Sequence, residues 1–306
     1  MHPDNSLGGD GPRLNDWLEG ARLRTLPAAA APVLIGAAAA YHLDSFSWGM
    51  SLLALLVALL LQIGVNFAND YSDGIRGTDV ERLGPVRLTA SGIISRGQVI
   101  RIALGCFALA GFAGLILIAW SGTWLLLLAG LAAVAAAWFY TGGNRPYGYM
   151  GIGLSELFVF IFFGLMATVA TTWVQARSAP GWLWFMASGM GLISIALLLV
   201  NNIRDIPTDA KVGKNTLAVR AGDRTSRALY VGALVLSAVL GAVGITVSVQ
   251  PALWGLWVLM VLLALALTTM LPVLVGASGR GLLRTLRNTG FYALSYAVLV
   301  SALLCL

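Results

Sequence analysis

Long apolar runs alternate with short polar segments along nearly the whole chain. Nine runs of about 20 residues cover roughly 24–43, 50–70, 98–120, 123–141, 151–173, 182–203, 228–249, 252–275 and 288–306. A helix needs about 20 apolar residues to cross the hydrocarbon core of a bilayer. The alternating pattern of barrel strands is missing, so the runs are helices. The pattern predicts an all-α polytopic membrane protein with nine transmembrane helices in a single domain, residues 1–306.

Composition supports a membrane protein. Hydrophobic residues make up 58% of the chain and charged residues 10%, against about 25% charged in soluble domains, which excludes a soluble enzyme and a disordered chain. Two cysteines exclude a disulfide scaffold. The segment 1–20 is a polar tail without an apolar run of its own, so we expect no cleaved signal peptide.

The basic residues indicate how the helices are oriented. With the N-terminus in the cytoplasm and nine spans, 18 of the 19 lysines and arginines fall on the cytoplasmic side, and only Arg177 falls outside. Such sorting is typical of a multi-pass protein of the cell membrane. The net charge of +6 is therefore mainly a topology signal, and we expect no nucleic acid partner.

Two long cytoplasmic loops, about 71–97 and 204–227, contain most of the acidic residues outside the N-terminal tail. Asn66 and Asp70 end the second span, and Asn201 and Asp205 end the sixth with the same spacing, 135 residues later. The match indicates a four-helix unit used twice, with a ninth helix added. We expect the two motifs to face each other across a cavity that opens to the cytoplasm, with both loops forming a cap.

The clustered carboxylates favour a divalent cation. Asn66, Asp70 and Asp73 share one helical face, whereas Pro207 disfavours continued helix and would place Asp209 on a new turn. Carboxylates at a membrane border repel each other and lose hydration. Mg²⁺ resolves this, because it takes oxygen ligands and is commonly shared between carboxylates and a substrate phosphate. The alternative is a set of helix-end acids paired with nearby arginines.

Several stretches carry a family resemblance. They are 22–27, 69–79, 84–92, 140–143, 148–151 with Glu156, 201–205 and 213–220. Here the sequence resembles the UbiA-type intramembrane prenyltransferases. The general type has a third acid four residues after Asp73, whereas this chain has Gly77 there and an acid at Asp79. That spacing is similar to the branch of the family that prenylates a naphthoate, and unlike the 4-hydroxybenzoate branch.

The resemblance implies a reaction and its partners. A polyprenyl diphosphate and 1,4-dihydroxy-2-naphthoate would give demethylmenaquinone, carbon dioxide and diphosphate, the prenyl step of menaquinone biosynthesis. Mg²⁺ would be the cofactor, the lipid bilayer would hold the prenyl tail, and no protein partner is implied.

We assign expected roles on this basis. The expected metal ligands are Asp70, Asp73, Asp205, Asp209 and Asn66. The expected catalytic residues are these four aspartates together with Asp79, Tyr140, whose ring could face an allylic cation, and Glu156, an intramembrane acid that could move a proton. The expected substrate-binding residues are Asn66, Asn69, Arg76, Asn201, Asn202, Lys211, Lys214 and Arg24, of which Arg24 could hold the naphthoate carboxylate.

Two other functions remain open from the sequence. A prenyltransferase with another acceptor, such as 4-hydroxybenzoate, haem or a sugar phosphate, would share the metal chemistry. A secondary transporter would share the repeats and the membrane acids. Transporters tend to place acids near the middle of the membrane, however, and here every strong acid of the spans except Glu156 lies at one border.

Overall fold

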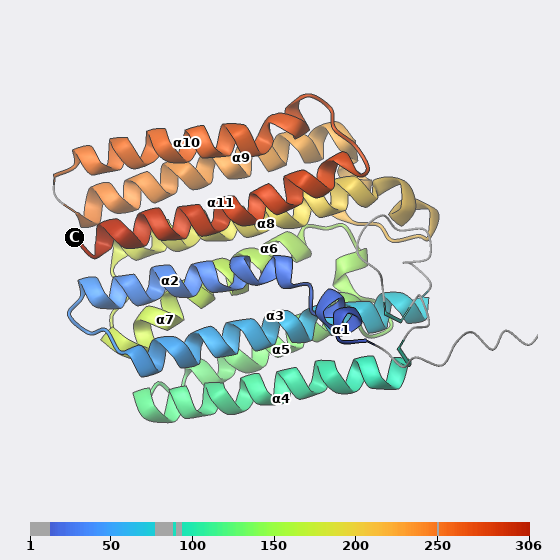
Figure 1. Cartoon of the computed structure of the whole chain (residues 1–306), viewed down its shortest axis with the longest axis horizontal. Coiled ribbons are helices and arrows are strands. Elements are labelled where there is room, and N and C mark those ends of the chain that lie inside the picture. Colours follow the sequence, from blue (N-terminus) through green and yellow to red (C-terminus); the bar gives the residue numbers. More distant parts are fainter. Residues whose placement is uncertain (1–12, 77–87, 90–93, 250) are drawn as a thin grey trace, which may run out of the picture.

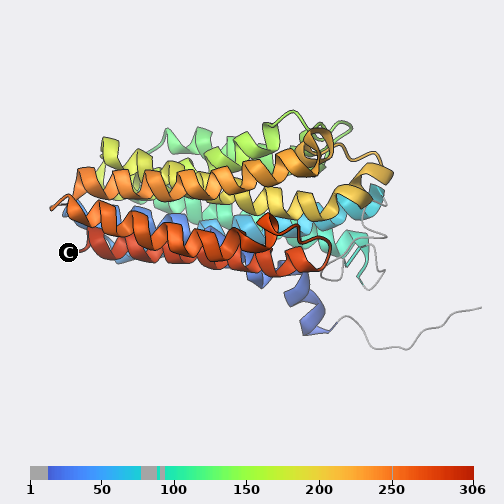
Figure 2. The same ribbon diagram turned by 90° about the horizontal axis from the view of Figure 1, so that it is seen from above.

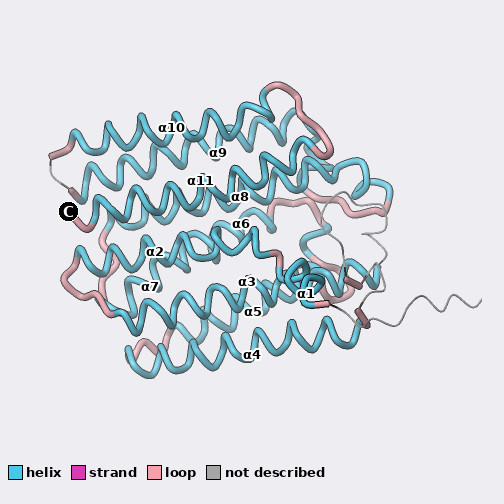
Figure 3. The backbone as a smooth tube through the Cα atoms, in the orientation of Figure 1, coloured by secondary structure: helices cyan, strands magenta, loops and turns pink. Residues whose placement is uncertain are grey.

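The computed structural model describes residues 13–76, 88–89, 94–249 and 251–306. Within them every regular element is a helix (Figures 1 and 3). The elements are α1 Leu14–Ala21, η1 Leu23–Thr25, α2 Leu26–His42, α3 Trp48–Arg76, α4 Arg96–Ser121, α5 Leu126–Thr141, η2 Tyr147–Tyr149, α6 Leu154–Val159, η3 Phe160–Met166, α7 Ala167–Ala176, α8 Gly181–Lys211, α9 Leu217–Ser248, α10 Leu253–Leu274 and α11 Gly281–Leu304.

The nine predicted helices are all found, in the predicted order. The fifth is built from α6, η3 and α7 in succession. Seven helical stretches in the described part of the chain are long and apolar enough to cross a membrane. The two that fall outside this criterion are α5, with 16 residues, and α11, whose first turns contain Arg284 and Arg287. The molecule is therefore a polytopic membrane protein.

The long helices lie side by side in one bundle. Figure 1 shows α8 to α11 in one half and α3 to α5 in the other, with α2 and α7 between them. The largest cluster of buried apolar side chains joins α2 with α8, α9, α10 and α11. Glycines allow the closest approaches: a Cβ at Gly164 of η3 would lie 2.3 Å from the Cα of Gly191 in α8. This backbone contact brings the fifth span directly against the second acidic helix.

The two acidic helices extend beyond the predicted spans. The spans were expected to end at residues 70 and 203, but α3 continues to Arg76 and α8 to Lys211. The expected break at Pro207 is wrong, because Pro207 lies inside α8 on its exposed side. Proline removes one helical hydrogen bond, and α8 continues through it because Arg204 holds Asp205 and Lys214 faces Asp209 around that turn. Asp205 and Asp209 therefore lie on one face of one helix.

The predicted loops change accordingly. Most of the expected loop 204–227 is helix, and only 212–216 connects α8 to α9. Helix α9 then bends at Gly222, whose φ is 80°. Residues 77–87 and 90–93 of the other expected loop lie outside the described residues. The polar tail contains an unpredicted helix, α1, which lies outside the main bundle (Figure 2).

Candidate active site

Four buried carboxylates lie where α3 and α8 end, at the same end of the bundle. Asp70 and Asp73 come from α3, and Asp205 and Asp209 from α8. Their exposed fractions are 1%, 3%, 1% and 2%. Loss of hydration at such depth is costly for a carboxylate unless hydrogen bonds or positive charge compensate. Each of the four has such partners.

The first motif is held by the neighbouring connections. Asp70 accepts hydrogen bonds from the backbone N–H groups of Leu88, at 2.9 Å, and Thr89, at 3.4 Å. Asp73 accepts a hydrogen bond on Oδ1 from the hydroxyl of Tyr149 in η2. Asp70 therefore fixes a part of the segment that follows α3, and Asp73 joins α3 to the connection between α5 and α6.

The second motif contains its own arginine. Arg204 donates from Nε and Nη2 to the two oxygens of Asp205, each at 2.7 Å, and its Nη2 also donates to Oδ1 of Asn201 at 2.9 Å. Arg204 is only 7% exposed. A two-point pair of this geometry is among the stronger charged contacts in proteins, so it fixes the orientation of Asp205.

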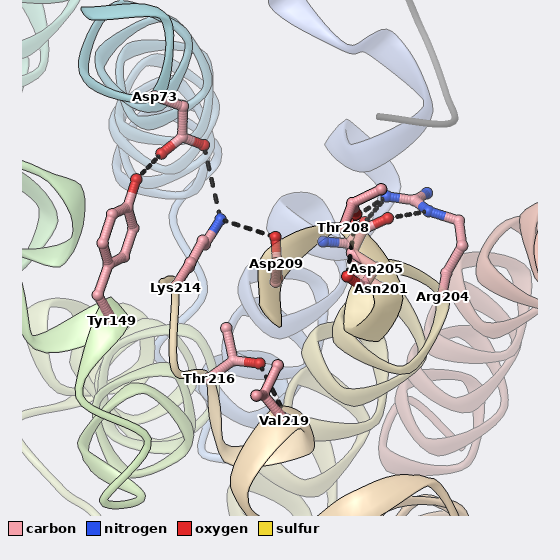
Figure 4. Close-up of polar contacts among 10 residues, drawn as sticks. All are labelled: Asp73, Tyr149, Asn201, Arg204, Asp205, Thr208, Asp209, Lys214, Thr216 and Val219. Atoms are coloured by element: carbon pink, nitrogen blue, oxygen red, sulfur yellow. Dashed lines mark hydrogen bonds and ion pairs between the residues drawn. The ribbon is translucent and has the colours of Figure 1, made fainter. Parts of the chain in front are cut away.

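Lys214 connects the two motifs. Its Nζ lies 3.8 Å from Oδ2 of Asp73 and 3.9 Å from Oδ1 of Asp209, and Figure 4 shows it between these carboxylates. The turn that delivers it depends on Gly213, whose φ of 74° is in the left-handed region that favours glycine. The backbone N–H of Lys214 then donates to the carbonyl of Asp209 at 2.9 Å.

Two of the predicted asparagines make contacts away from these carboxylates. Asn66 donates from Nδ2 to the carbonyl of Ala21 and to the hydroxyl of Thr25, at 2.9 and 3.1 Å, which ties α3 to the start of the first span. Asn69 accepts from the hydroxyl of Thr141 at 2.9 Å. The structure thus gives Asn66 and Asn69 positions that stabilise the helix contacts beside the acids.

The cations near η2 gather around one ring. The guanidinium of Arg76 donates to the backbone carbonyls of Thr141 and Gly143. It lies 5.4 Å from the ring centre of Tyr149, and Nζ of Lys214 lies 5.1 Å from the same ring centre. An aromatic ring attracts cations at this distance. Tyr149 therefore brings Arg76, Lys214 and Asp73 together.

Tyr140 and Glu156 lie on either side of η2. The ring of Tyr140 meets that of Tyr147 edge-on, with 5.6 Å between centres. Burial raises the pKa of Tyr147, whose hydroxyl donates to the carbonyl of Ala136 at 2.7 Å. Glu156 lies in the first turn of α6. It is 8% exposed, and its Oε1 is buried with no hydrogen-bond partner among the described residues.

The remaining predicted residues are spread around the site. Asn202 is buried in α8, Lys211 is exposed at its last residue, and Arg24 is exposed in η1. Asp79 lies outside the described residues. The structure thus places Asp73, Asp209 and Lys214 in contact, and it does not bring Arg24 to them.

Sequence reasoning missed Tyr149 and Arg204. Tyr149 belongs to a stretch that carried the family resemblance, but a tyrosine near a membrane border is ordinarily an anchor. Arg204 stands beside Asp205 in the second motif, and was counted only as positive charge on the cytoplasmic side. Adjacency to a motif acid was the available signal for Arg204. No comparable signal existed for Tyr149.

The donor set is suited to Mg²⁺. It consists of carboxylate oxygens, the ligands that hard cations prefer. Among the described residues, the buried cations Arg204 and Lys214 offset two of the four negative charges. In the described part of the chain, no three acidic, histidine or cysteine side chains form one metal-sized group. A metal shared by both motifs would therefore require small shifts of these side chains.

An apolar cavity of about 190 Å³ lies beneath the acids, between α2, α3, α4, α5, η3 and α7. Val65 and Ala137 line it, five residues before Asp70 and three before Tyr140 respectively. Further along, Gly114 and Gly130 line it, and a Cβ added at Gly130 would meet no atom within 4 Å. Because its walls are apolar, the cavity can accept a hydrocarbon chain.

Comparison with known proteins agrees with this arrangement. Residues 29–280 match the UbiA prenyltransferase family. The chain is 46% identical over 288 residues to the 1,4-dihydroxy-2-naphthoate octaprenyltransferase of Mycobacterium tuberculosis, covering 94% of this chain and 96% of that protein. It is 38% identical over 260 residues to the protein of the same name from Escherichia coli, covering 79% and 80% of the two chains.

The fold also matches solved structures. A UbiA homologue from Archaeoglobus fulgidus, solved bound to DMAPP and Mg²⁺, superposes with a TM-score of 0.68 at 14% identity, covering 94% of this chain and 99% of that one. The resemblance inferred from the two acidic motifs is thereby confirmed, and the chain belongs to the UbiA prenyltransferase family.

Proposed function

We propose that the protein transfers a polyprenyl group from polyprenyl diphosphate to 1,4-dihydroxy-2-naphthoate, with loss of carbon dioxide. The product is demethylmenaquinone, formed in its quinol state. The observation that carries this proposal is the buried set of carboxylates from α3 and α8 beside Lys214. The named activity of relatives that match nearly the whole chain supports the naphthoate acceptor.

Asp70, Asp73, Asp205 and Asp209 would hold Mg²⁺. When bound, Mg²⁺ would neutralise the diphosphate and make it a better leaving group. Lys214 and Arg76 both lie against the ring of Tyr149, which is hydrogen-bonded to Asp73. Their positive charges would bind the diphosphate oxygens. Lys211 is the third cation that we assign to the diphosphate. Asn66, Asn69, Asn201 and Asn202 would support the two motifs.

Bond making and breaking follow from the substrates. The bond between the prenyl C1 and the diphosphate oxygen breaks, and its electrons leave with diphosphate. The electron-rich ring carbon that bears the carboxylate forms the new bond to C1, and loss of that carboxylate as carbon dioxide restores the aromatic ring. The ring of Tyr140 would face the developing allylic cation. Arg24 would bind the carboxylate of the acceptor. Asp79 and Glu156 would hold its hydroxyl groups, accepting a hydroxyl proton as the ring attacks and returning it when carbon dioxide leaves.

The cavity explains how both ends of the donor are accommodated. Its apolar walls would hold the first isoprene units, because a hydrocarbon chain gains free energy on leaving water. The connection 212–216 between α8 and α9, together with Leu88 and Thr89 beside Asp70, would help to exclude water, which would otherwise react with the allylic cation.

The test is turnover by the purified protein in detergent with Mg²⁺, 1,4-dihydroxy-2-naphthoate and octaprenyl diphosphate. Mass spectrometry would measure prenylated product and released diphosphate. We expect Asp70→Asn and Asp205→Asn each to lower kcat/KM by about a hundredfold or more, since each removes a charge that offsets the metal. Chelation should have the same effect.

The matched control is Asp44→Asn. Asp44 is exposed in the connection between α2 and α3, and its φ of 53° is one that asparagine tolerates. Its turnover should stay within about twofold of the unmutated protein. If product formed with a different aromatic acceptor and not with 1,4-dihydroxy-2-naphthoate, the proposed acceptor would be wrong. Absence of product with every acceptor would contradict the proposal and favour a transporter.

A further inference from the structure

Lys214 is held differently from the other buried cation of the site. Arg204 makes two hydrogen bonds of 2.7 Å to Asp205. Lys214 instead lies 3.8 and 3.9 Å from its two carboxylates, close enough for attraction but beyond hydrogen-bond length. Arg204 is therefore a fixed partner of one acid, whereas Lys214 is a point charge between two acids that belong to different motifs.

The Nζ of Lys214 occupies the place where a divalent cation bound by both Asp73 and Asp209 would lie. Asp73 and Asp209 both direct an oxygen at its Nζ, as Figure 4 shows. An ammonium and a divalent cation cannot occupy the space between two carboxylates together, because their charges repel at such short range. Any metal that takes both carboxylates must therefore displace the ammonium.

The displaced ammonium has somewhere to go. The ring centre of Tyr149 is 5.1 Å from Nζ, and a lysine side chain has four rotatable carbons with which to move its charge. Tyr149 itself stays attached to Asp73 through its hydroxyl. A diphosphate arriving with the metal would offer the ammonium new oxygen partners on the same side.

We propose that Lys214 is a positioning residue that competes with the divalent cation for Asp73 and Asp209. It holds the two motifs together until the metal replaces it, and it then turns to the diphosphate. This inference rests on the proposed function for the identity of the metal and the diphosphate. Its test needs no turnover, so the two proposals can fail separately.

The experiment titrates purified protein with Mn²⁺ alone. The electron paramagnetic resonance signal of the unbound ion gives the Mn²⁺ affinity. We expect Lys214→Met to bind Mn²⁺ about tenfold more tightly than the unmutated protein, because the competing charge is gone. Arg101→Met is the matched control: Arg101 is exposed near the start of α4, and its loss changes net charge equally. It should leave the Mn²⁺ affinity unchanged.

A second titration adds inorganic diphosphate in the presence of saturating Mg²⁺. Lys214→Met should bind diphosphate about tenfold more weakly, because it lacks the ammonium partner. The opposite signs of the two effects distinguish exchange from a structural role, which would weaken both. Mn²⁺ affinity that is equal to or lower than that of the unmutated protein would overturn the proposal.

Loss of stability in Lys214→Met does not remove the test. Asp73 and Asp209 would then lose the ammonium that lies between them, so the variant should melt at a lower temperature without divalent ions. Added Mg²⁺ should raise its melting temperature more than that of the unmutated protein, because ligand binding stabilises the folded state. Equal shifts in both proteins would contradict exchange.

Discussion

At the scale of single residues, the two oxygens of Asp73 have different partners. Oδ1 accepts a hydrogen bond from the hydroxyl of Tyr149, and Oδ2 faces the ammonium of Lys214. A carboxylate held at one oxygen cannot rotate freely, so the other oxygen keeps its direction. Tyr149 therefore determines where Asp73 points, although the sequence analysis gave this tyrosine no role.

Tyr149→Phe tests this influence. The ring remains beside Arg76 and Lys214, but the hydrogen bond to Asp73 is lost. Hydrogen bonds to charged groups contribute about 1.5–3 kcal/mol, so we expect the Mg²⁺ concentration required for half-maximal turnover to rise about tenfold. Prenyl transfer measured across a Mg²⁺ titration provides the readout.

Tyr147→Phe is the matched control for that substitution. The hydroxyl of Tyr147 donates to the carbonyl of Ala136 in α5. Burial raises its pKa, so the group stays neutral at ordinary pH. Its removal should lower the melting temperature and leave the Mg²⁺ requirement unchanged. Equal Mg²⁺ requirements in both variants would show that Tyr149 does not orient Asp73.

The sequence could indicate the four aspartates because charge is rare in such an apolar chain, and two matching motifs are conspicuous within it. Adjacency made Arg204 one possible partner of Asp205 but could not decide the pairing, and nothing in the spacing indicated that Asn66 bonds to Ala21 and Thr25. Those partners are decided by side-chain direction and by contacts between distant segments, which residue spacing does not record.

At the scale of elements, the turn between α8 and α9 positions one end of the site. Gly213 adopts φ 74°, and Thr216 starts α9 by accepting a hydrogen bond from the N–H of Val219. The turn is only five residues long, so a change at Gly213 is transmitted directly to Lys214.

Gly213→Ala should disturb this turn. A Cβ at this position meets no atom within 4 Å, so the expected cost is the left-handed backbone itself, about 1 kcal/mol. We expect a lower melting temperature and several-fold lower kcat, as Lys214 is moved from Asp73 and Asp209. Thermal unfolding and steady-state turnover would measure the two effects.

Gly97→Ala gives the comparison. Gly97 also has open space around its Cβ position, but it lies in the first turn of α4, where alanine is the better helix former. It should be neutral or slightly stabilising. If Gly213→Ala behaved in the same way, the turn would not depend on glycine.

Hydropathy located the nine apolar helices but neither the polar helix α1 nor the ends of α3 and α8 that carry the acids. It detects the apolar middle of a span, whereas α3 and α8 continue as polar helices whose acids are satisfied by neighbouring segments. Pro207 is the clearest example. A local rule predicted a break there, and packing around Asp205 and Asp209 maintained the helix.

At the scale of the whole molecule, the charged residues gather at one end of the helix bundle. The described acids of both motifs, the turn 212–216 and the start of α11 lie at one end of the long helices (Figure 1). Of the described residues, most lysines and arginines lie at or near that end. We propose that this end faces the cytoplasm, because basic residues favour that side of a membrane.

Single cysteines would test this orientation. In a chain whose Cys106 and Cys305 are replaced by alanine, Ser278→Cys lies between α10 and α11, and Ser178→Cys lies between α7 and α8. A membrane-impermeant maleimide should label position 278 only in inverted vesicles and position 178 only in right-side-out spheroplasts. The reverse pattern would place the site outside.

The short α5 has a consequence for depth. Its 16 residues span about 24 Å, against a hydrocarbon core of about 30 Å. The segment that follows, with η2 and the first turn of α6, must then begin below the level of the lipid headgroups, or the bilayer must thin around it. The polar contacts of Tyr149 would thus lie at the depth where a membrane-dissolved donor carries its own diphosphate. Such a donor can react without lifting its tail out of the lipid. The prenylated product then stays in the bilayer, whereas diphosphate leaves into water.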